Sequence, residues 1–170
     1  SLGGWVGLQL AIDHPERLHG VVSMGTGGAQ LTGALKSHSN PVLTPEGIRE
    51  TLEKFVVDKS LITDELVRLR FESAQNDTAS DRLKQVVTAR DRDRNEFPLD
   101  FDALAKLEMP VLLIHGMQDV VITPSRTWDL LQTIPHADAH IFNQCGHWSQ
   151  VEKAEEFNKV VGLYLKERGA

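Results

Sequence analysis

The strongest constraint on the fold of this chain lies at its start, where a serine, a large residue and two glycines lead into an apolar run. Ser1-Leu2-Gly3-Gly4 is followed by mostly apolar residues from Trp5 to Ile12. Apolar side chains on almost all sides predict a buried helix, which Pro15 ends. The small residues would let the backbone turn tightly beneath a raised serine hydroxyl, as in a nucleophile elbow between a strand and a helix. Many ordinary helix starts share this pattern, so it does not decide the function alone.

Three short apolar runs predict the strands of a parallel sheet: residues 18–24, 111–114 and 139–142. Apolar runs of this length are typical of strands that are buried on both faces. Helices are expected at residues 125–134 and 151–165. This order of elements predicts an α/β layered domain, in which a sheet of only three strands would be incomplete.

The middle of the chain shows helical periodicity and no strand pattern. Thr44-Pro45 and Thr63 are good helix starts, and Ser80 begins a third expected helix. The charged residues 90–94 are expected to form a solvated face. We therefore divide the chain into a core segment (1–34), a helical lid (35–100) and a second core segment (101–170).

Composition excludes several classes of partner. The chain has 170 residues and a net charge of -6, which disfavours nucleic acid, because phosphate binding requires a basic surface. No apolar run approaches the length of a membrane span. The single cysteine, Cys145, cannot form an internal disulfide and suits a reducing compartment. We expect a cytoplasmic protein without a nucleic-acid or membrane partner.

Two chemically informative residues follow predicted strands. Asp119 ends the segment His115-Gly116-Met117-Gln118-Asp119, and His147 lies in Cys145-Gly146-His147-Trp148. Each alone fits a turn or surface residue. Serine, then acid, then histidine, each beside a strand end, is however the order of a catalytic triad. The imidazole takes the proton of the hydroxyl, and the carboxylate fixes the imidazole tautomer. We predict that Ser1, Asp119 and His147 are catalytic.

The other histidines show no metal-ligand spacing with cysteines or acids, and we predict no metal and no cofactor. They are His14, His19, His38, His115, His136 and His140.

These motifs together resemble the meta-cleavage product hydrolases of aromatic degradation, which cut a carbon–carbon bond in 2-hydroxy-6-oxo-hexa-2,4-dienoate compounds. The resemblance covers essentially the whole chain, from the nucleophile serine to the C-terminus. It implies the C-terminal portion of an α/β-hydrolase fold, a parallel sheet with flanking helices, with a helical lid insertion. The segments that carry it are Ser1–Gly4, Ser60–Leu66, His115–Asp119 with Pro124, and Cys145–Gln150 with Glu152.

The resemblance also implies roles for residues outside the triad. Arg70 matches a lid arginine that binds the carboxylate end of the dienoate substrate, for which a guanidinium is suited. Arg68 is a nearby rival for this role. Trp148 would pack on the dienoate, and the backbone N–H of Leu2 would contribute to the oxyanion hole.

Two alternatives remain open at this stage. One is a carboxylesterase or lactonase with the same triad, and the other is a catalytically silent binding module. We expect a homo-oligomer. We also expect a separate amino-terminal polypeptide, cut from one precursor before Ser1 by self-cleavage or by outside proteolysis. Without it, the helix at residues 2–12 and the strand at 111–114 would each keep a bare face.

Overall fold

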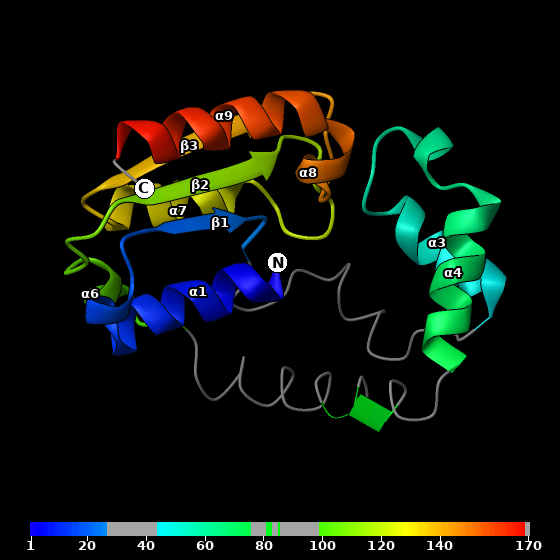
Figure 1. The fold of residues 1–170 in the computed structure, drawn as a ribbon, viewed down its shortest axis with the longest axis horizontal. Coiled ribbons are helices and arrows are strands. Elements are labelled where there is room, and N and C mark those ends of the chain that lie inside the picture. Colours follow the sequence, from blue (N-terminus) through cyan, green and yellow to red (C-terminus); the bar gives the residue numbers. More distant parts are fainter. Residues whose placement is uncertain (27–43, 76–80, 83–84, 86–98, 169–170) are drawn as a thin grey trace.

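The computed structural model describes residues 1–26, 44–75, 81, 82, 85 and 99–168. Within these ranges three parallel strands form one sheet: β1 (Val21–Met24), β2 (Val111–Gly116) and β3 (Ala137–Phe142). The strand order is β1-β2-β3, and Val111 of β2 lies beside Val21 on one side and Ala137 on the other. The carboxyl ends of the strands therefore meet at one edge of the sheet (Figure 1). Functional groups of open α/β sheets gather at this edge.

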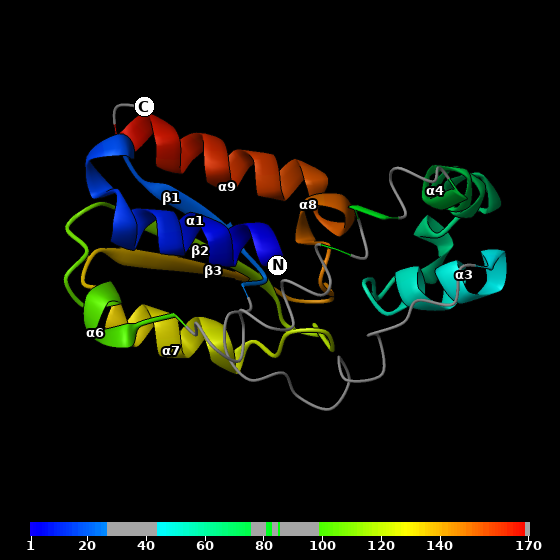
Figure 2. The same ribbon diagram turned by 90° about the horizontal axis from the view of Figure 1, so that it is seen from below.

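The central strand β2 is buried along its whole length. Val111 and Leu113 face a core formed with α1 (Leu2–Asp13), α6 (Phe101–Leu104) and α7 (Ser125–Thr133). Leu112 and Ile114 face a second core beneath α9 (Ala154–Glu167). Figure 2 shows α9 and α7 on opposite sides of the sheet. The expectation of a bare face on this strand is therefore wrong, because helices cover both faces.

The first helix is buried on one side only. Leu8 and Ala11 of α1 are fully buried, whereas Val6 is 56% exposed. The apolar residues around this helix thus exceed what the described neighbours cover. The helix ends at Asp13, before the short 3₁₀ helix η1 (Pro15–Arg17).

The expected helix at residues 151–165 is interrupted. The structure has a short helix, α8 (Ser149–Glu152), and then α9, with Lys153 between them at φ -124° and ψ 38°. The backbone of Lys153 lies outside the helical region, so the two helices cannot be continuous. Because of this break, Glu152 is the last residue of the short helix α8.

Residues 44–75 form a separate helical unit beyond the carboxyl edge of the strands (Figure 1). We call it the α3–α4 unit; it contains α3 (Pro45–Glu53), the 3₁₀ helix η2 (Lys59–Leu61) and α4 (Asp64–Gln75). The side chains of Thr44 and Thr63 accept hydrogen bonds from the N–H groups of Gly47 (3.1 Å) and Leu66 (3.2 Å), as expected for helix caps. Most of the third expected helix and all of residues 90–94 lie outside the described residues, and a lid spanning 35–100 stays a prediction. None of the helices in the described ranges is long and apolar enough to span a membrane.

Candidate active site

The turn after β2 holds Asp119 in a buried position. Its Oδ1 accepts hydrogen bonds from the backbone N–H groups of Val121 (2.8 Å) and Ile122 (2.9 Å). The turn thus fixes the carboxylate through its own backbone and leaves Oδ2 for other partners.

His147, in the loop after β3, contacts this second oxygen. Its Nδ1 lies 2.7 Å from Asp119 Oδ2, and the two side chains are only 5% and 0% exposed. Because a carboxylate only accepts, Nδ1 carries the proton, and Nε2 of the neutral ring is then free to accept one. The pair has the orientation of an acid and a base in a serine triad.

A second histidine lies on the other side of the same carboxylate. Nε2 of His115 is 3.0 Å from Asp119 Oδ2 and 2.8 Å from the carbonyl oxygen of Ile122. Its Nδ1 is 2.7 Å from the hydroxyl of Thr127. Two facing oxygens require a proton on Nε2, and the threonine hydroxyl donates to Nδ1 of the neutral ring. From the sequence, His115 was predicted only not to bind a metal, and this contact was not predicted; its place in the buried strand before the acid was the available signal.

These contacts determine the ionisation of Asp119. Burial alone would raise the pKa of its carboxyl group. The hydrogen bonds from His115 and His147, the charge of the His147 ring when it is protonated, and the Ile122 N–H outweigh burial, and together they hold the pKa well below its usual value. Asp119 is therefore a stable anion beside His147.

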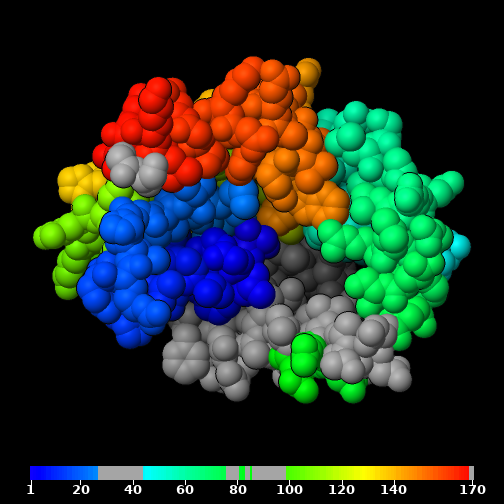
Figure 3. Space-filling view, in the orientation of Figure 1, coloured from blue at the N-terminus to red at the C-terminus, as the bar shows by residue number. Residues whose placement is uncertain are grey.

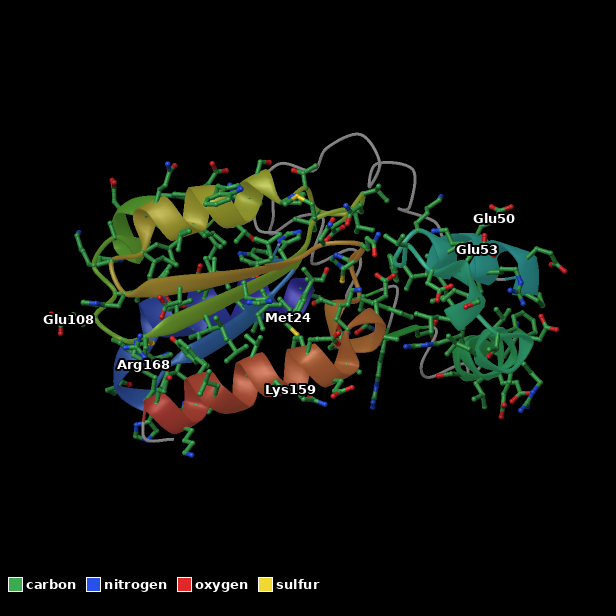
Figure 4. All side chains as sticks on the ribbon, turned by 90° about the horizontal axis from the view of Figure 1, so that it is seen from above. Met24, Glu50, Glu53, Glu108, Lys159 and Arg168 are labelled. Atoms are coloured by element: carbon green, nitrogen blue, oxygen red, sulfur yellow. The ribbon has the colours of Figure 1, made fainter. Side chains whose placement is uncertain are left out.

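Ser1 lies directly before α1 and is exposed. Its backbone nitrogen donates to the carbonyl oxygen of Met24, the last residue of β1. The Met24 side chain packs between the sheet and α9 (Figure 4). The next residue, Gly25, has a φ of 49°, and a Cβ there would lie 3.0 Å from Cε1 of His147. Ser1 and His147 thus contact consecutive residues at the end of β1.

The glycine at position 4 allows α1 to approach β1 closely. A Cβ at Gly4 would lie 2.6 Å from the Ser23 hydroxyl and would also collide with Thr26. Leu2 is the first residue of α1, so its N–H has no acceptor within the helix. The small residue thus lets the helix start lie against the end of the strand.

Arg70 and Trp148 lie together although they are distant in sequence. The Cζ atom of Arg70 is 5.7 Å from the centre of the Trp148 ring, within range of a cation–π interaction. Arg68 instead forms an ion pair with Glu72 at 2.8 Å. Of the two arginines, Arg70 faces the loop that carries His147. Figure 3 shows a hollow in the surface between the start of α1, the region of α8 and the α3–α4 unit.

Other features lie outside this constellation. Two surface cavities of about 580 Å³ each lie at the amino-terminal edge of the sheet, around Met109 and around Gly20, away from His147. Burial, with the Glu152 carboxylate as the next cause, raises the pKa of the Cys145 thiol to about 12, so this thiol is unreactive. Among the described residues, no group of three or more histidines, cysteines or acids could hold a metal ion.

The family of this chain follows from comparison with known proteins. A model of the alpha/beta hydrolase fold matches residues 1–154. The chain belongs to the α/β-hydrolase family. The parallel sheet with flanking helices is the core of this fold, which confirms the expected fold class.

Several relatives of this α/β-hydrolase are named as hydrolases of particular substrates. It is 32% identical over 173 residues to a 2-hydroxymuconate semialdehyde hydrolase from Pseudomonas putida, covering 100% of this chain and 62% of the relative. It is also 32% identical over 179 residues to a 2-hydroxy-6-oxononadienedioate/2-hydroxy-6-oxononatrienedioate hydrolase from Burkholderia vietnamiensis, covering 98% of this chain and 60% of the relative.

Solved structures of hydrolases also match this chain. A meta-cleavage product hydrolase from Pseudomonas fluorescens IP01, in a mutant form with acetates, matches with a TM-score of 0.89 and 30% identity over 96% of this chain and 61% of that one. A 2-hydroxy-6-oxo-6-phenylhexa-2,4-dienoate hydrolase from Rhodococcus sp. strain RHA1 matches with a TM-score of 0.84 and 25% identity over 98% of this chain and 62% of that one. The chain thus spans somewhat over half the length of these proteins.

Proposed function

We propose that this α/β-hydrolase cleaves a carbon–carbon bond in 2-hydroxy-6-oxo-hexa-2,4-dienoate-type meta-cleavage products. The observation that carries the proposal is the place of Arg70, whose guanidinium lies over Trp148, the residue next to His147. A cation that can bind a carboxylate therefore lies near a histidine–aspartate pair that can activate a nucleophile. The names of the relatives support the same substrate class.

In the proposed mechanism, Arg70 holds the substrate carboxylate while the dienol ketonises. His147 Nε2 takes a proton from Ser1 or from a water that Ser1 assists, and the oxygen adds to the 6-carbonyl. The Leu2 N–H stabilises the resulting oxyanion, and Asp119 stabilises the imidazolium. The carbon–carbon bond then breaks, and with one water consumed the products are a 2-hydroxydienoate and a carboxylic acid. Trp148 packs against the dienoate.

The triad is tested by replacing its members one at a time in the full-length protein. Ser1→Ala, Asp119→Asn and His147→Ala should each lower kcat for a coloured dienoate by about 10³-fold or more, because the three groups act as a unit. Circular dichroism checks that the fold is kept. Near wild-type turnover by Ser1→Ala would exclude the triad.

The same assay separates the alternatives. A carboxylesterase or lactonase would turn over a nitrophenyl ester or a lactone but not the dienoate. A silent binding module would hydrolyse none of these, and a serine-directed phosphonate would leave Ser1 unlabelled. A separate amino-terminal polypeptide, a homo-oligomer and a cytoplasmic location stay predictions. Native mass spectrometry of the purified protein tests the first two of these.

A further inference from the structure

One carboxylate connects the α3–α4 unit to the loop of the candidate catalytic histidine. Glu152, the last residue of α8, accepts hydrogen bonds from three backbone N–H groups. Its Oε1 accepts from Val57 (2.7 Å) and Asp58 (3.1 Å), and its Oε2 accepts from Gly146. The first two donors belong to the turn after α3, and the third immediately precedes His147.

The two connected segments are also in direct contact. The N–H of Trp148 donates to the carbonyl oxygen of Phe55 at 3.0 Å. The Phe55 ring is 5.4 Å from the His147 ring and 5.2 Å from the Trp148 ring, measured between centres. A Cβ at Gly146 would lie 2.7 Å from the Phe55 carbonyl oxygen. The turn formed by residues 55–58 therefore lies directly on the loop formed by residues 145–148.

The chemistry of this position requires a carboxylate. Both oxygens of an ionised glutamate accept, so one side chain can bind donors that come from two segments. A glutamine has one accepting oxygen, and its NH₂ group would face an N–H on one of the two sides. Hydrogen bonds to a charged acceptor are also about twice as strong as neutral ones. Glutamine, the neutral isostere of glutamate, therefore cannot accept the hydrogen bonds from both segments.

We propose that Glu152 is a positioning residue that couples the α3–α4 unit to the His147 loop. The coupling holds Arg70 at a fixed position relative to His147. Arg70 binds the substrate carboxylate, and His147 activates the nucleophile. This inference rests on the proposed function, since it assigns Glu152 a part in the same reaction. In the sequence, Glu152 belongs to a segment that carries the family resemblance, but no pattern there indicates a role for it.

The first test measures the coupling without using activity. In the full-length protein, Glu152→Gln should speed amide hydrogen exchange at Val57, Asp58 and also Gly146. Glu156→Gln is the matched control, because Glu156 is exposed on α9 and its replacement removes the same charge. Faster exchange on only one side of the contact, or equal effects of the two variants, would overturn the coupling. This readout stands even if the dienoate proves not to be the substrate.

The second test is a double-mutant cycle with Arg70→Ala. Glu152→Gln alone should lower kcat/KM for the dienoate by about 10- to 100-fold, the range expected when charge-assisted hydrogen bonds are lost. In the Arg70→Ala background the loss should be much smaller, because the arginine that Glu152 aligns is already absent. Glu152→Asp keeps the charge but is one methylene shorter, and we expect an intermediate loss. If the role of Glu152 were purely structural, Glu152→Gln would lower Tm and change kcat/KM by the same factor in both backgrounds, which would refute the proposal. Full activity of Glu152→Asp would refute the bridging geometry.

Discussion

Asp119 is the residue at which most interactions of the candidate site meet. One oxygen is held by its own turn, at Val121 and Ile122, and the other lies between His147 and His115. The backbone contacts fix where the carboxylate lies, and the His147 contact selects the imidazole tautomer with Nε2 free. The His115 contact adds a donor from the buried strand itself, so the sheet as well as the turn holds the acid in place.

The low pKa of Asp119 predicts a contribution to stability that depends on pH. Because the folded-state pKa lies below the unfolded value of about 3.9, the contribution is complete above that value and is lost as pH falls toward the folded pKa. Asp119→Asn lacks this titrating carboxyl group. Urea unfolding should therefore show a stability difference between wild type and Asp119→Asn that shrinks from about pH 5 to about pH 3. A difference that stays constant over this range would contradict the prediction.

Replacing each of the two neighbouring arginines by alanine should have different effects on catalysis. Arg70→Ala should lower kcat/KM for the dienoate by about 10- to 100-fold, as expected for loss of a charge-assisted contact, and should hardly affect a neutral nitrophenyl ester. Arg68→Ala breaks only an exposed ion pair with Glu72 and should change little. Steady-state kinetics on both substrates is the measurement. Equal losses on dienoate and ester in Arg70→Ala would indicate a damaged helical unit and not a lost substrate contact.

Among the elements, the contact between α1 and β1 gives the sharpest steric prediction. Gly4→Ala puts a Cβ against Ser23 and Thr26 and should destabilise the protein by about 1–3 kcal/mol, as overpacking does. Gly3→Ala is the matched control: in the described part of the chain a Cβ there meets no atom within 4 Å. It should gain up to about 1 kcal/mol from helix propensity. Urea unfolding compares the two variants, and equal stabilities would show that the helix does not lie this close to the strand.

The elements themselves were largely predictable because local patterns determine them. The apolar run after Ser1 predicted α1, and the run at residues 111–114 predicted β2. The caps Thr44 and Thr63 predicted the starts of α3 and α4. Asp119 was singled out because it follows β2. The roles of His115 and Glu152 depend on partners that approach from other segments, and so does the cover on both faces of β2. No periodicity encodes such contacts, and the break at Lys153 was missed because its apolar pattern continues through it.

At the scale of the molecule, the described residues form two bodies with separate apolar clusters. The sheet and its helices enclose two clusters around β2, whereas the α3–α4 unit has its own, formed by Leu52, Val56, Ile62 and Val67. Arg49 stabilises the unit internally through the Ile62 carbonyl oxygen (2.7 Å) and Asp64. The turn at residues 55–58 contacts the His147 loop through backbone groups, Glu152 and the Phe55 ring, and Trp148 of that loop packs against the cluster of the α3–α4 unit. We therefore predict that the smaller body can unfold locally while the sheet stays folded.

Native-state hydrogen exchange tests this division. Ile62→Ala and Leu113→Ala both remove a buried aliphatic side chain, at 3% and 1% exposure, and each should cost about 2–5 kcal/mol where the residue packs. Ile62→Ala should therefore speed amide exchange in α3 and α4 and leave the amides of β2 protected. Leu113→Ala should lower the global stability and so speed exchange of the β2 amides, which are released only when the sheet unfolds. If Ile62→Ala sped exchange in β2 as much as in α4, the two bodies would unfold as one cooperative unit, and the proposed division would be wrong.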